Sequence, residues 1–363
     1  MMSWSHTHPS KLIEGTSFNK EAVFEAWGEA QYSLALLEGS QRRLENPTLL
    51  LSPLITKEAT TSSGIEGTQS TVTDVFAFTA GAEPDATDAR EVANYRKAMM
   101  YAITQMEAGR VLSKSLLNEM HAMLLDGVRR NPDSVTGALR QKTVWIGEGG
   151  TPIEDAAYIP PEHFLLDEYM DDMISFATSA TEKSLIKSGV AHYQFEAVHP
   201  YDDGNGRIGR LLIPLLLFSE KKMTLPILYI SGYFEKNKSE YIQALRSVDR
   251  SSDFTDWLIF FMNAVTQQLY ETQSLVDQIY DLHVRLRYAC TGLQQRYVLD
   301  FIDFLFRSPI FTRSDLQASV SMSYVTADKL VKDFLEQGFV KKTKIKKGRS
   351  EVYAFEPLIR ILG

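Results

Sequence analysis

The stretch Phe195-Glu-Ala-Val-His-Pro-Tyr-Asp-Asp-Gly-Asn-Gly-Arg-Ile-Gly-Arg210 gathers titratable, amide and glycine residues into one short segment. Residues 184–198 favour a helix that ends within it, and the leucine-rich residues 211–220 favour a second helix after it. Glycines at 204 and 206 let backbone N–H groups approach a ligand closely, and the positive end of the second helix points to the same place. The stretch therefore predicts an anion-binding turn between two helices.

The side chains of this turn suit the transfer of a phosphoryl-type group. Arg207 and Arg210 can each hold phosphate oxygens with two hydrogen bonds, and Asp203 can hold a Mg²⁺ ion that bridges two phosphates. His199 is then placed to take a proton from an attacking hydroxyl. Each residue alone has a structural explanation, as a helix terminator or a surface ion pair, but together they serve one in-line reaction.

Three other motif assignments fail. Residues 204–209 match G-x-G-x-x-G, but a dinucleotide fingerprint follows a strand, and the preceding pattern here is helical. Glu196 and His199 form an E-x-x-H with His192 one turn earlier, yet a di-iron bundle needs a second E-x-x-H, which the chain lacks. No P-loop pattern occurs either.

Composition excludes several classes of protein. The chain has 363 residues and a net charge of −8, which suits two packed domains and not a disordered polymer. Cys290 is the only cysteine, so no intramolecular disulfide or cysteine-built metal site is available, and a reducing compartment fits best. Residues 1–20 lack a leader pattern, and the longest apolar stretch, residues 211–218, is too short to cross a bilayer. We therefore expect a soluble, cytoplasmic protein without membrane contact.

Hydrophobic periodicity predicts an all-α body with one irregular insert, residues 143–161. β-branched and aromatic residues before a glycine cluster predict a short strand and a small β-hairpin there. The residues that open it are Val144, Trp145, Ile146 and Gly147. Such an insert is either an ordinary connection or a place where binding function lies.

The tail differs from the body in charge and pattern. Residues 290–363 carry twelve Lys and Arg against eight Asp and Glu, a net charge of +4, whereas the rest of the chain carries −12. Three helices between residues 296 and 338 and a hairpin after them resemble a winged helix-turn-helix module. Six of the nine residues 341–349 are basic, which suits contact with DNA phosphates. A solvated hairpin or a dimerisation module is the alternative.

At this point the chain resembles the Fic family. Residues 199–210 fit the family signature H-x-F-x-[DE]-G-N-G-R-x-x-R except that Tyr201 replaces the phenylalanine. A chance match to the seven other fixed positions is on the order of one in a million. The resemblance covers roughly residues 21–284 in helix order and spacing, and some family members carry a winged helix.

The resemblance implies an all-α, Fic-type helical core with a small β-hairpin flap, and transfer of AMP from ATP to a hydroxyl of a protein side chain. His199 would be the general base, and Asp203 the Mg²⁺ ligand. The phosphates would be held by the rest of the loop: Gly204, Asn205, Gly206, Arg207 and Arg210. Residues 143–161 would be the flap that pins the target segment by strand addition. Tyr241 would lie against adenine; Asp249, where some members have asparagine, leaves the polar contact there in doubt.

A second motif resembles the family's inhibitory pattern [ST]-x-x-x-E-[GN]. It comprises Ser62, Glu66 and Gly67, N-terminal to the catalytic loop. Glu66 can pair with Arg210 and take the place of the γ-phosphate, which would leave ATP in a pose unsuited to attack. A capped turn with a surface glutamate is the alternative, and Glu66 could instead orient a water for the removal of AMP.

The motifs and the resemblance together predict an autoinhibited protein adenylyltransferase with three regions. These are an N-terminal helical region with the inhibitory motif (residues 1–110), a Fic catalytic core (residues 111–289) and a winged helix-turn-helix domain (residues 290–363). The expected co-substrate is ATP with Mg²⁺, and the expected partner is a protein with an accessible Ser, Thr or Tyr hydroxyl, or the chain itself. A homodimer would offer a way to control Glu66. The alternatives are removal of AMP, transfer of UMP, phosphocholine or phosphate, and a DNA-binding regulator whose Fic body senses nucleotide. The two arginines favour a triphosphate donor.

Overall fold

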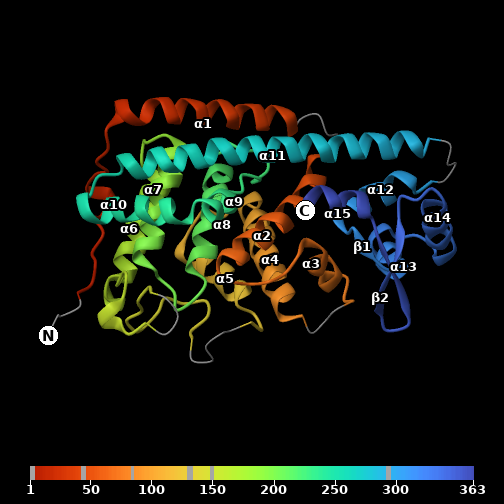
Figure 1. Cartoon of the computed structure of the whole chain (residues 1–363), viewed down its shortest axis with the longest axis horizontal. Coiled ribbons are helices and arrows are strands. Elements are labelled where there is room, and N and C mark those ends of the chain that lie inside the picture. The colour runs from red at the N-terminus through yellow and green to blue at the C-terminus, as the bar shows by residue number, and fades with distance from the viewer. Residues whose placement is uncertain (1–4, 42–45, 83–85, 129–133, 148–150, 292–295) are drawn as a thin grey trace. The chain divides into compact units, whose positions relative to one another are not determined.

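The computed structural model describes residues 5–41, 46–82, 86–128, 134–147, 151–291 and 296–363. The chain divides into two compact units, one made of Met1–Ala35 and Lys97–Leu269, the other of Leu36–Arg96 and Tyr270–Gly363. Three helices continue from one unit into the other (Figure 1): α1 (Lys20–Gln41), α4 (Thr87–Glu107) and α11 (Thr255–Ala289). The region boundaries expected after residues 110 and 289 divide the chain differently and stay predictions.

The first unit is helical and is centred on α7. Besides its parts of α1, α4 and α11, it contains α5 (Lys114–Leu124), α6 (Leu166–Ser179), α7 (Ser184–Val198), α8 (Asn205–Ser219), α9 (Ser231–Lys236) and α10 (Lys238–Ser251). α7 packs against both α6 and α8 (Figure 1), and nearly all of its residues are buried. A helix buried on all sides fits at the middle of a core, and α7 begins and ends where its sequence pattern predicts.

The second unit joins the inhibitory pattern to the tail. It contains α2 (Leu51–Ile65), α3 (Val72–Thr79), α12 (Val298–Arg307), α13 (Arg313–Val320), α14 (Tyr324–Glu336), α15 (Glu356–Leu362) and the strands β1 (Ile310–Phe311), β2 (Lys341–Lys347) and β3 (Ser350–Ala354). The Ser52 hydroxyl of α2 donates to the Arg307 carbonyl at 2.7 Å, and the Lys57 ammonium donates to the Leu362 carbonyl at 2.6 Å. Polar contacts therefore fix α2 to the ends of α12 and α15.

The tail has the order predicted from its sequence, with one strand and one helix added. The three strands pair in the order β1-β3-β2, all antiparallel, and Ile310 faces Ala354 across the first pair. Thr312 and Asp315 form a capping box at the start of α13, as the capped pattern there indicates. The two-residue strand β1 and the seven-residue helix α15 are too short to give a periodic signal. The winged-helix assignment of this module stays a prediction.

The helical character expected of the body is confirmed, and the sequence pattern missed α2, α3 and α9. The eight-residue α3 and the six-residue α9 show few repeats of a 3.6-residue period, so packing decides them. The fifteen-residue α2 is rich in Ser and Thr, which have low helix propensity and weaken the pattern. Within the described residues, no helix has both the length and the apolar character needed to cross a membrane.

Gly189 in α7 provides a test of this packing. A Cβ atom there would lie 2.8 Å from Cδ1 of Phe261, a side chain with no solvent exposure. Gly28 in α1 has no atom within 4 Å of the same position. Both changes to alanine gain the same helix propensity, so we expect Gly189→Ala to be less stable than Gly28→Ala by about 1–3 kcal/mol in urea unfolding. Equal stability of the two variants would contradict the close packing of α7.

Candidate active site

The predicted anion-binding turn lies between the buried helices α7 and α8. Its first residue, His199, follows α7 in a left-handed conformation, with φ 48° and ψ 62°. Its last residue, Gly204, is also left-handed, with φ 79°, and precedes α8. A Cβ at Gly204 would lie 3.2 Å from Leu124. The glycine therefore meets both a backbone and a space requirement, and the N-terminus of α8 points into the turn.

Two polar side chains fix the backbone of this turn from inside. The Asn205 side chain accepts from the Tyr201 N–H and donates to the Tyr201 carbonyl, both at 2.8 Å. The fully buried Tyr201 donates its hydroxyl to Asn118 of α5 at 2.9 Å. Asn118 thus supplies the partner that a buried tyrosine needs where the family signature has phenylalanine. The Asn205 side chain, which is predicted to hold phosphate, hydrogen-bonds to the backbone of the turn in this structure.

His121 is a residue of the site that the sequence did not indicate. It is fully buried in α5, and its ring stacks on Tyr201 at a centroid distance of 3.9 Å. Its Nδ1 accepts from the Gly137 N–H at 3.0 Å, so the proton lies on Nε2, which donates to the Asp203 carbonyl at 2.9 Å. Burial lowers the pKa of His121 to about 4. A neutral histidine therefore holds the Asp203 backbone.

The charged groups lie at the end of the turn, at the start of α8. Arg207 and Arg210 are 1% and 3% exposed. The half-exposed Asp203 carboxylate accepts from the Gly204 N–H at 2.6 Å and from Arg207 at 3.2 Å. Two buried guanidinium groups beside a helix N-terminus make this end of the turn strongly positive. The arrangement suits an anion with several oxygens.

The fit for Mg²⁺ depends on Asp203. No group of three or more His, Cys, Asp or Glu side chains that would cage a metal ion is present among the described residues. Mg²⁺ usually takes one or two protein carboxylates together with substrate phosphates and water. The same oxygen of Asp203 accepts from both Gly204 and Arg207, so the second oxygen fits this mode of binding.

His199 is half-buried. Its Nδ1 lies 3.4 Å from the Glu196 carbonyl, a group that can only accept, so this contact favours the tautomer with the proton on Nδ1. The lone pair is then on Nε2, where a general base needs it.

His192, the third residue of the rejected metal motif, is a structural residue. Its Nδ1 donates to the Gly209 carbonyl at 2.9 Å, and its Nε2 accepts from the Tyr241 hydroxyl at 3.0 Å. Burial lowers the pKa of His192 to about 3, so it is neutral. Gly209 brings α8 close to α7, since a Cβ there would lie 2.4 Å from a Glu196 carboxylate oxygen.

The two residues predicted to contact adenine lie on α10. The Tyr241 ring stacks on Phe234 at a centroid distance of 4.3 Å, and its hydroxyl bonds to His192. The half-buried Asp249 accepts from the Tyr193 hydroxyl at 2.7 Å, and burial raises the pKa of its carboxyl group. Both side chains therefore connect α10 with α7, and their contact with adenine stays a prediction.

In the described parts of the flap, residues 143–147 and 151–161, the strand pairing is one isolated antiparallel bridge between Ile146 and Tyr158. Gly147 is exposed and Val144 half-buried, while Trp145 and Ile146 are 44% and 39% exposed. The rest of the predicted glycine cluster, residues 148–150, lies outside the described residues. The exposed apolar side chains fit a segment that pairs with another chain.

Arg140 is the second residue that the sequence did not indicate. It precedes the flap, is 1% exposed, and donates from Nε to the His199 carbonyl at 2.8 Å. Burial lowers the pKa of Arg140 to about 10, which leaves it charged at neutral pH.

The residues of the inhibitory pattern lie at the end of α2, in the second unit. Ser62 is fully buried within the helix, Glu66 is the exposed residue after it, and Gly67 follows with φ 91°. The Thr68 hydroxyl donates to the buried Glu91 of α4 at 2.9 Å, which fixes this turn within its unit. The pairing of Glu66 with Arg210 stays a prediction.

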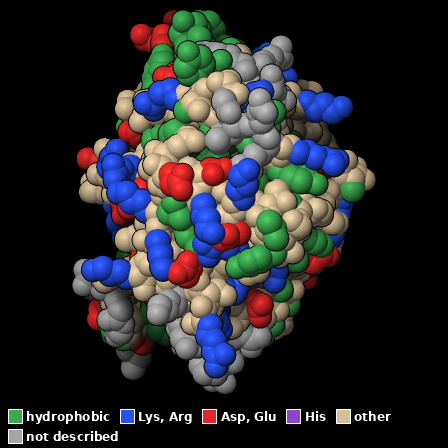
Figure 2. All heavy atoms as spheres, turned by 90° about the vertical axis from the view of Figure 1, so that its right-hand side faces the viewer, with side chains coloured by type: hydrophobic (Ala, Val, Ile, Leu, Met, Phe, Trp, Pro, Cys, Tyr) green, Lys and Arg blue, Asp and Glu red, His purple; other side chains and the backbone are tan. Residues whose placement is uncertain are grey.

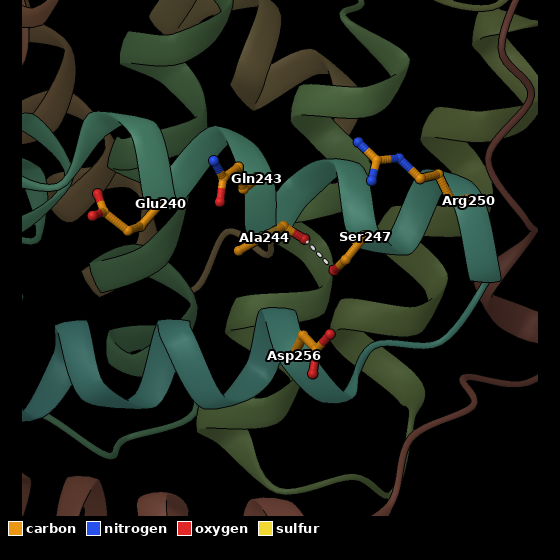
Figure 3. A pocket seen from close by; sticks show the side chains of 6 residues that line it. All are labelled: Glu240, Gln243, Ala244, Ser247, Arg250 and Asp256. Carbon is orange, nitrogen blue, oxygen red and sulfur yellow. Dashed lines mark hydrogen bonds between the residues drawn. The ribbon is translucent and has the colours of Figure 1, made fainter.

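An open groove of about 510 Å³ lies elsewhere on the first unit, over α10 (Figure 3). Glu240, Gln243, Ala244, Ser247 and Arg250 line it from one face of α10, and Asp256 lines it from the start of α11. These positions differ from those of Tyr241 and Asp249, which contact α7. The groove does not include the turn.

The buried His121 makes stability depend on pH. Its folded-state pKa of about 4 lies below the ordinary value of 6.5, so its neutral form stabilises the fold above pH 6.5, and this contribution is lost as pH falls toward 4. His121→Phe keeps a ring against Tyr201 but removes both hydrogen bonds. We expect it to cost about 1–3 kcal/mol at pH 7. We also expect it to reduce the loss of unfolding free energy between pH 7 and 5 by about 2 kcal/mol. An unchanged difference between these pH values would contradict the neutral state of His121.

Comparison with known proteins identifies the family of the chain. Residues 24–104 match the Fic/DOC family N-terminal region, and residues 111–217 match the Fic/DOC family domain. The second range contains the turn and the two buried arginines of α8, residues 199–210. The chain is 33% identical over 120 residues to the protein adenylyltransferase fic-1 of Caenorhabditis briggsae, an alignment that covers 30% of this chain and 22% of that protein. The chain spans about a quarter of the length of the curated relatives it matches.

Solved structures share the fold. A Fic family protein from Desulfovibrio desulfuricans aligns with a TM-score of 0.58 and 22% identity, over 92% of this chain and 95% of that one. Fic-1 from Caenorhabditis elegans aligns with a TM-score of 0.53 and 17% identity, over 71% of this chain and 74% of that one. The two matched family regions together cover more than half of the sequence, and the histidine and two buried arginines stand where the family signature has them. The chain therefore belongs to the Fic/DOC family.

Proposed function

We propose that the protein is an adenylyltransferase that moves AMP from ATP to a Ser, Thr or Tyr hydroxyl of a target protein or of itself. One observation carries the proposal. His199, whose Nδ1 contact favours a lone pair on Nε2, lies at one end of the turn, and two buried arginines lie at the helix N-terminus at its other end. The Fic/DOC domain match and relatives named protein adenylyltransferase support it.

The residues of the turn would divide the reaction between them. Arg207 and Arg210, with the positive end of α8, would hold the phosphates of ATP. His199 would accept the proton of the target hydroxyl at Nε2 as that oxygen attacks the α-phosphorus. The new bond joins the hydroxyl oxygen to the α-phosphorus, and the bond to the β-phosphate oxygen breaks, so pyrophosphate leaves. The proton stays on His199 until solvent or product removes it.

Asp203 would hold the Mg²⁺ that accompanies ATP. The ion would supply positive charge that offsets the charge of the ATP phosphates. The chain's own contribution is to fix the Asp203 backbone through His121 and one Asp203 oxygen through the Gly204 N–H.

We propose that Glu66 inhibits this activity. Its carboxylate would pair with Arg210 and compete with the γ-phosphate of ATP. The inhibition would therefore require the negative charge of Glu66. The buried Ser62 and the Thr68–Glu91 hydrogen bond make the end of α2 a defined platform for that carboxylate. Homodimerisation as a control of Glu66 stays a prediction.

The first experiment compares AMP transfer from labelled ATP with Mg²⁺ by wild type, Glu66→Gly and Glu66→Gly with His199→Ala. We expect more transfer by the single variant than by wild type, and a fall of about 10²–10⁴-fold when the general base is removed. Gln69→Gly, on the same exposed turn, is the matched control and should behave like wild type.

Each other outcome has a distinct meaning. A folded Glu66→Gly variant that adds no AMP to candidate targets or to itself would overturn the transferase proposal. Release of AMP from a modified protein by wild type, lost in Glu66→Gly, would favour the removal reaction. Transfer from UTP or CDP-choline instead of ATP would change the donor and keep the site.

The sequence also predicts that the C-terminal module contacts DNA. The ion pairs of its hairpin make this contact less favourable. In the hairpin, Lys341 pairs with Glu356 at 2.8 Å and Lys347 with Asp315 at 3.2 Å, while Lys342 pairs with Glu351. Acidic and basic side chains are interspersed on the face of the molecule that Figure 2 shows. Lysines with acidic neighbours release fewer counterions from a duplex.

We therefore expect duplex binding by the full chain to be no tighter than about 10⁻⁴–10⁻⁶ M at physiological salt, the range of non-specific binding. Gel shift and fluorescence anisotropy with a mixed-sequence duplex measure it. Glu351→Gln with Glu356→Gln should tighten binding at low salt because it removes two acidic partners. Nanomolar binding by wild type would instead support the DNA-binding regulator.

A further inference from the structure

The last carbonyl groups of α7 have no hydrogen-bond donors within the helix. Residues that flank the flap or belong to it provide these donors. Tyr158 donates its hydroxyl to the Ala197 carbonyl at 2.9 Å. Arg140 donates to the next three carbonyls, from Nη2 to Val198 at 3.3 Å, from Nε to His199 at 2.8 Å, and from its backbone N–H to Pro200 at 2.9 Å. Four consecutive carbonyls around the general base are therefore held from one neighbouring segment.

The same guanidinium also holds the flap. Nη1 of Arg140 donates to the Lys142 carbonyl at 2.9 Å, and Nη2 donates to the Pro161 carbonyl at 2.6 Å. Lys142 immediately precedes the flap, and Pro161 is its last residue. One side chain thus joins the two ends of the flap to the residue that carries the base.

The chemistry of arginine suits this position. Its planar group presents donors in fixed directions, whereas a lysine ammonium is a point charge that cannot reach four separate carbonyls in one plane. A cation at the C-terminus of α7 is favoured by the helix dipole. Arg140 also stabilises the left-handed conformation of His199, which costs energy in a residue other than glycine.

We propose that Arg140 is a positioning residue that fixes the distance between the His199 imidazole and a target segment paired with the flap. The proposal rests on the proposed function, because it assigns the flap to the target. This positioning role differs from a general structural role, because loss of Arg140 would affect the flap and the α7–α8 turn together and would leave the proposed nucleotide site on α8 unchanged.

The first test measures AMP transfer by Arg140→Lys in the Glu66→Gly background. We expect kcat to fall by about 10²-fold, the cost of misplacing a reacting group by about 1 Å. The Kd for ATP, measured by calorimetry, should change less than about threefold, because Arg207 and Arg210 are untouched. Equal loss of ATP affinity and kcat, or full activity, would overturn the proposal.

The matched control is Arg110→Lys. Arg110 lies in the same unit and pairs with Glu119 of α5 at 2.6 Å. It also donates to Tyr101, Gln105 and Ser115, which lie outside the flap and the turn. We expect its kcat to equal that of the Glu66→Gly parent. A comparable loss in this control would indicate that any arginine-to-lysine change in the unit lowers activity.

A second test does not depend on activity. In Arg140→Lys, hydrogen exchange of peptides spanning the Ile146–Tyr158 bridge and of peptides covering residues 195–204 should both speed up by about tenfold or more, since several hydrogen bonds are lost. Peptides of α6 should be unchanged. Tyr158→Phe removes one hydroxyl and should give a smaller change in the same two regions, even if Arg140→Lys folds poorly.

The outcomes separate this inference from the proposed function. If the Glu66→Gly parent transfers no AMP, the function fails, and the exchange data alone decide the coupling. If the parent is active and exchange at the flap and the turn is independent in Arg140→Lys, the positioning role fails while the function stands.

Discussion

The hydrogen-bonding requirement at the end of α7 is the constraint on which the rest of the site depends. A helix leaves its last carbonyl groups without internal partners, and here they are buried at the centre of a unit. Tyr158 and Arg140 from the flap region satisfy them, while Asn205 and His121 hold the turn that follows. The groups that satisfy the backbone also determine where His199 and residues 143–161 lie, so the stability of the unit and the geometry of the candidate site depend on one set of contacts.

The electrostatics of the turn follow from the same burial. Desolvation keeps His121 and His192 neutral, so each serves as a fixed donor and acceptor between backbone groups and side chains. The guanidinium groups of Arg207 and Arg210 are buried at the start of α8 and add to the positive end of its helix dipole. Neutral histidines inside and cations at the turn produce a site that attracts an anion without a clustered metal cage among the described residues.

The second unit gives the inhibitory pattern a structural setting. α2 ends at Ile65, directly before Glu66, and its first half is held by the ends of α12 and α15 through Ser52 and Lys57. A change in the C-terminal module would therefore be transmitted to α2 through packed contacts and not through a flexible linker. These contacts join α2 directly to the C-terminal module, although more than 200 residues separate α2 and α12 in the sequence.

The sequence by itself determined the helical fold, the limits of α7 and the residues of the turn, because buried periodicity and a dense local motif are both encoded by near neighbours. It also determined the order of the C-terminal elements. Only the tertiary structure decided that His121 and Arg140 belong to the site. It also decided that Tyr201 donates to Asn118 and that Tyr193 donates to Asp249. These contacts join residues between 56 and 83 positions apart in the chain. No local pattern records such pairs, since they arise when buried polar groups find partners as the helices pack.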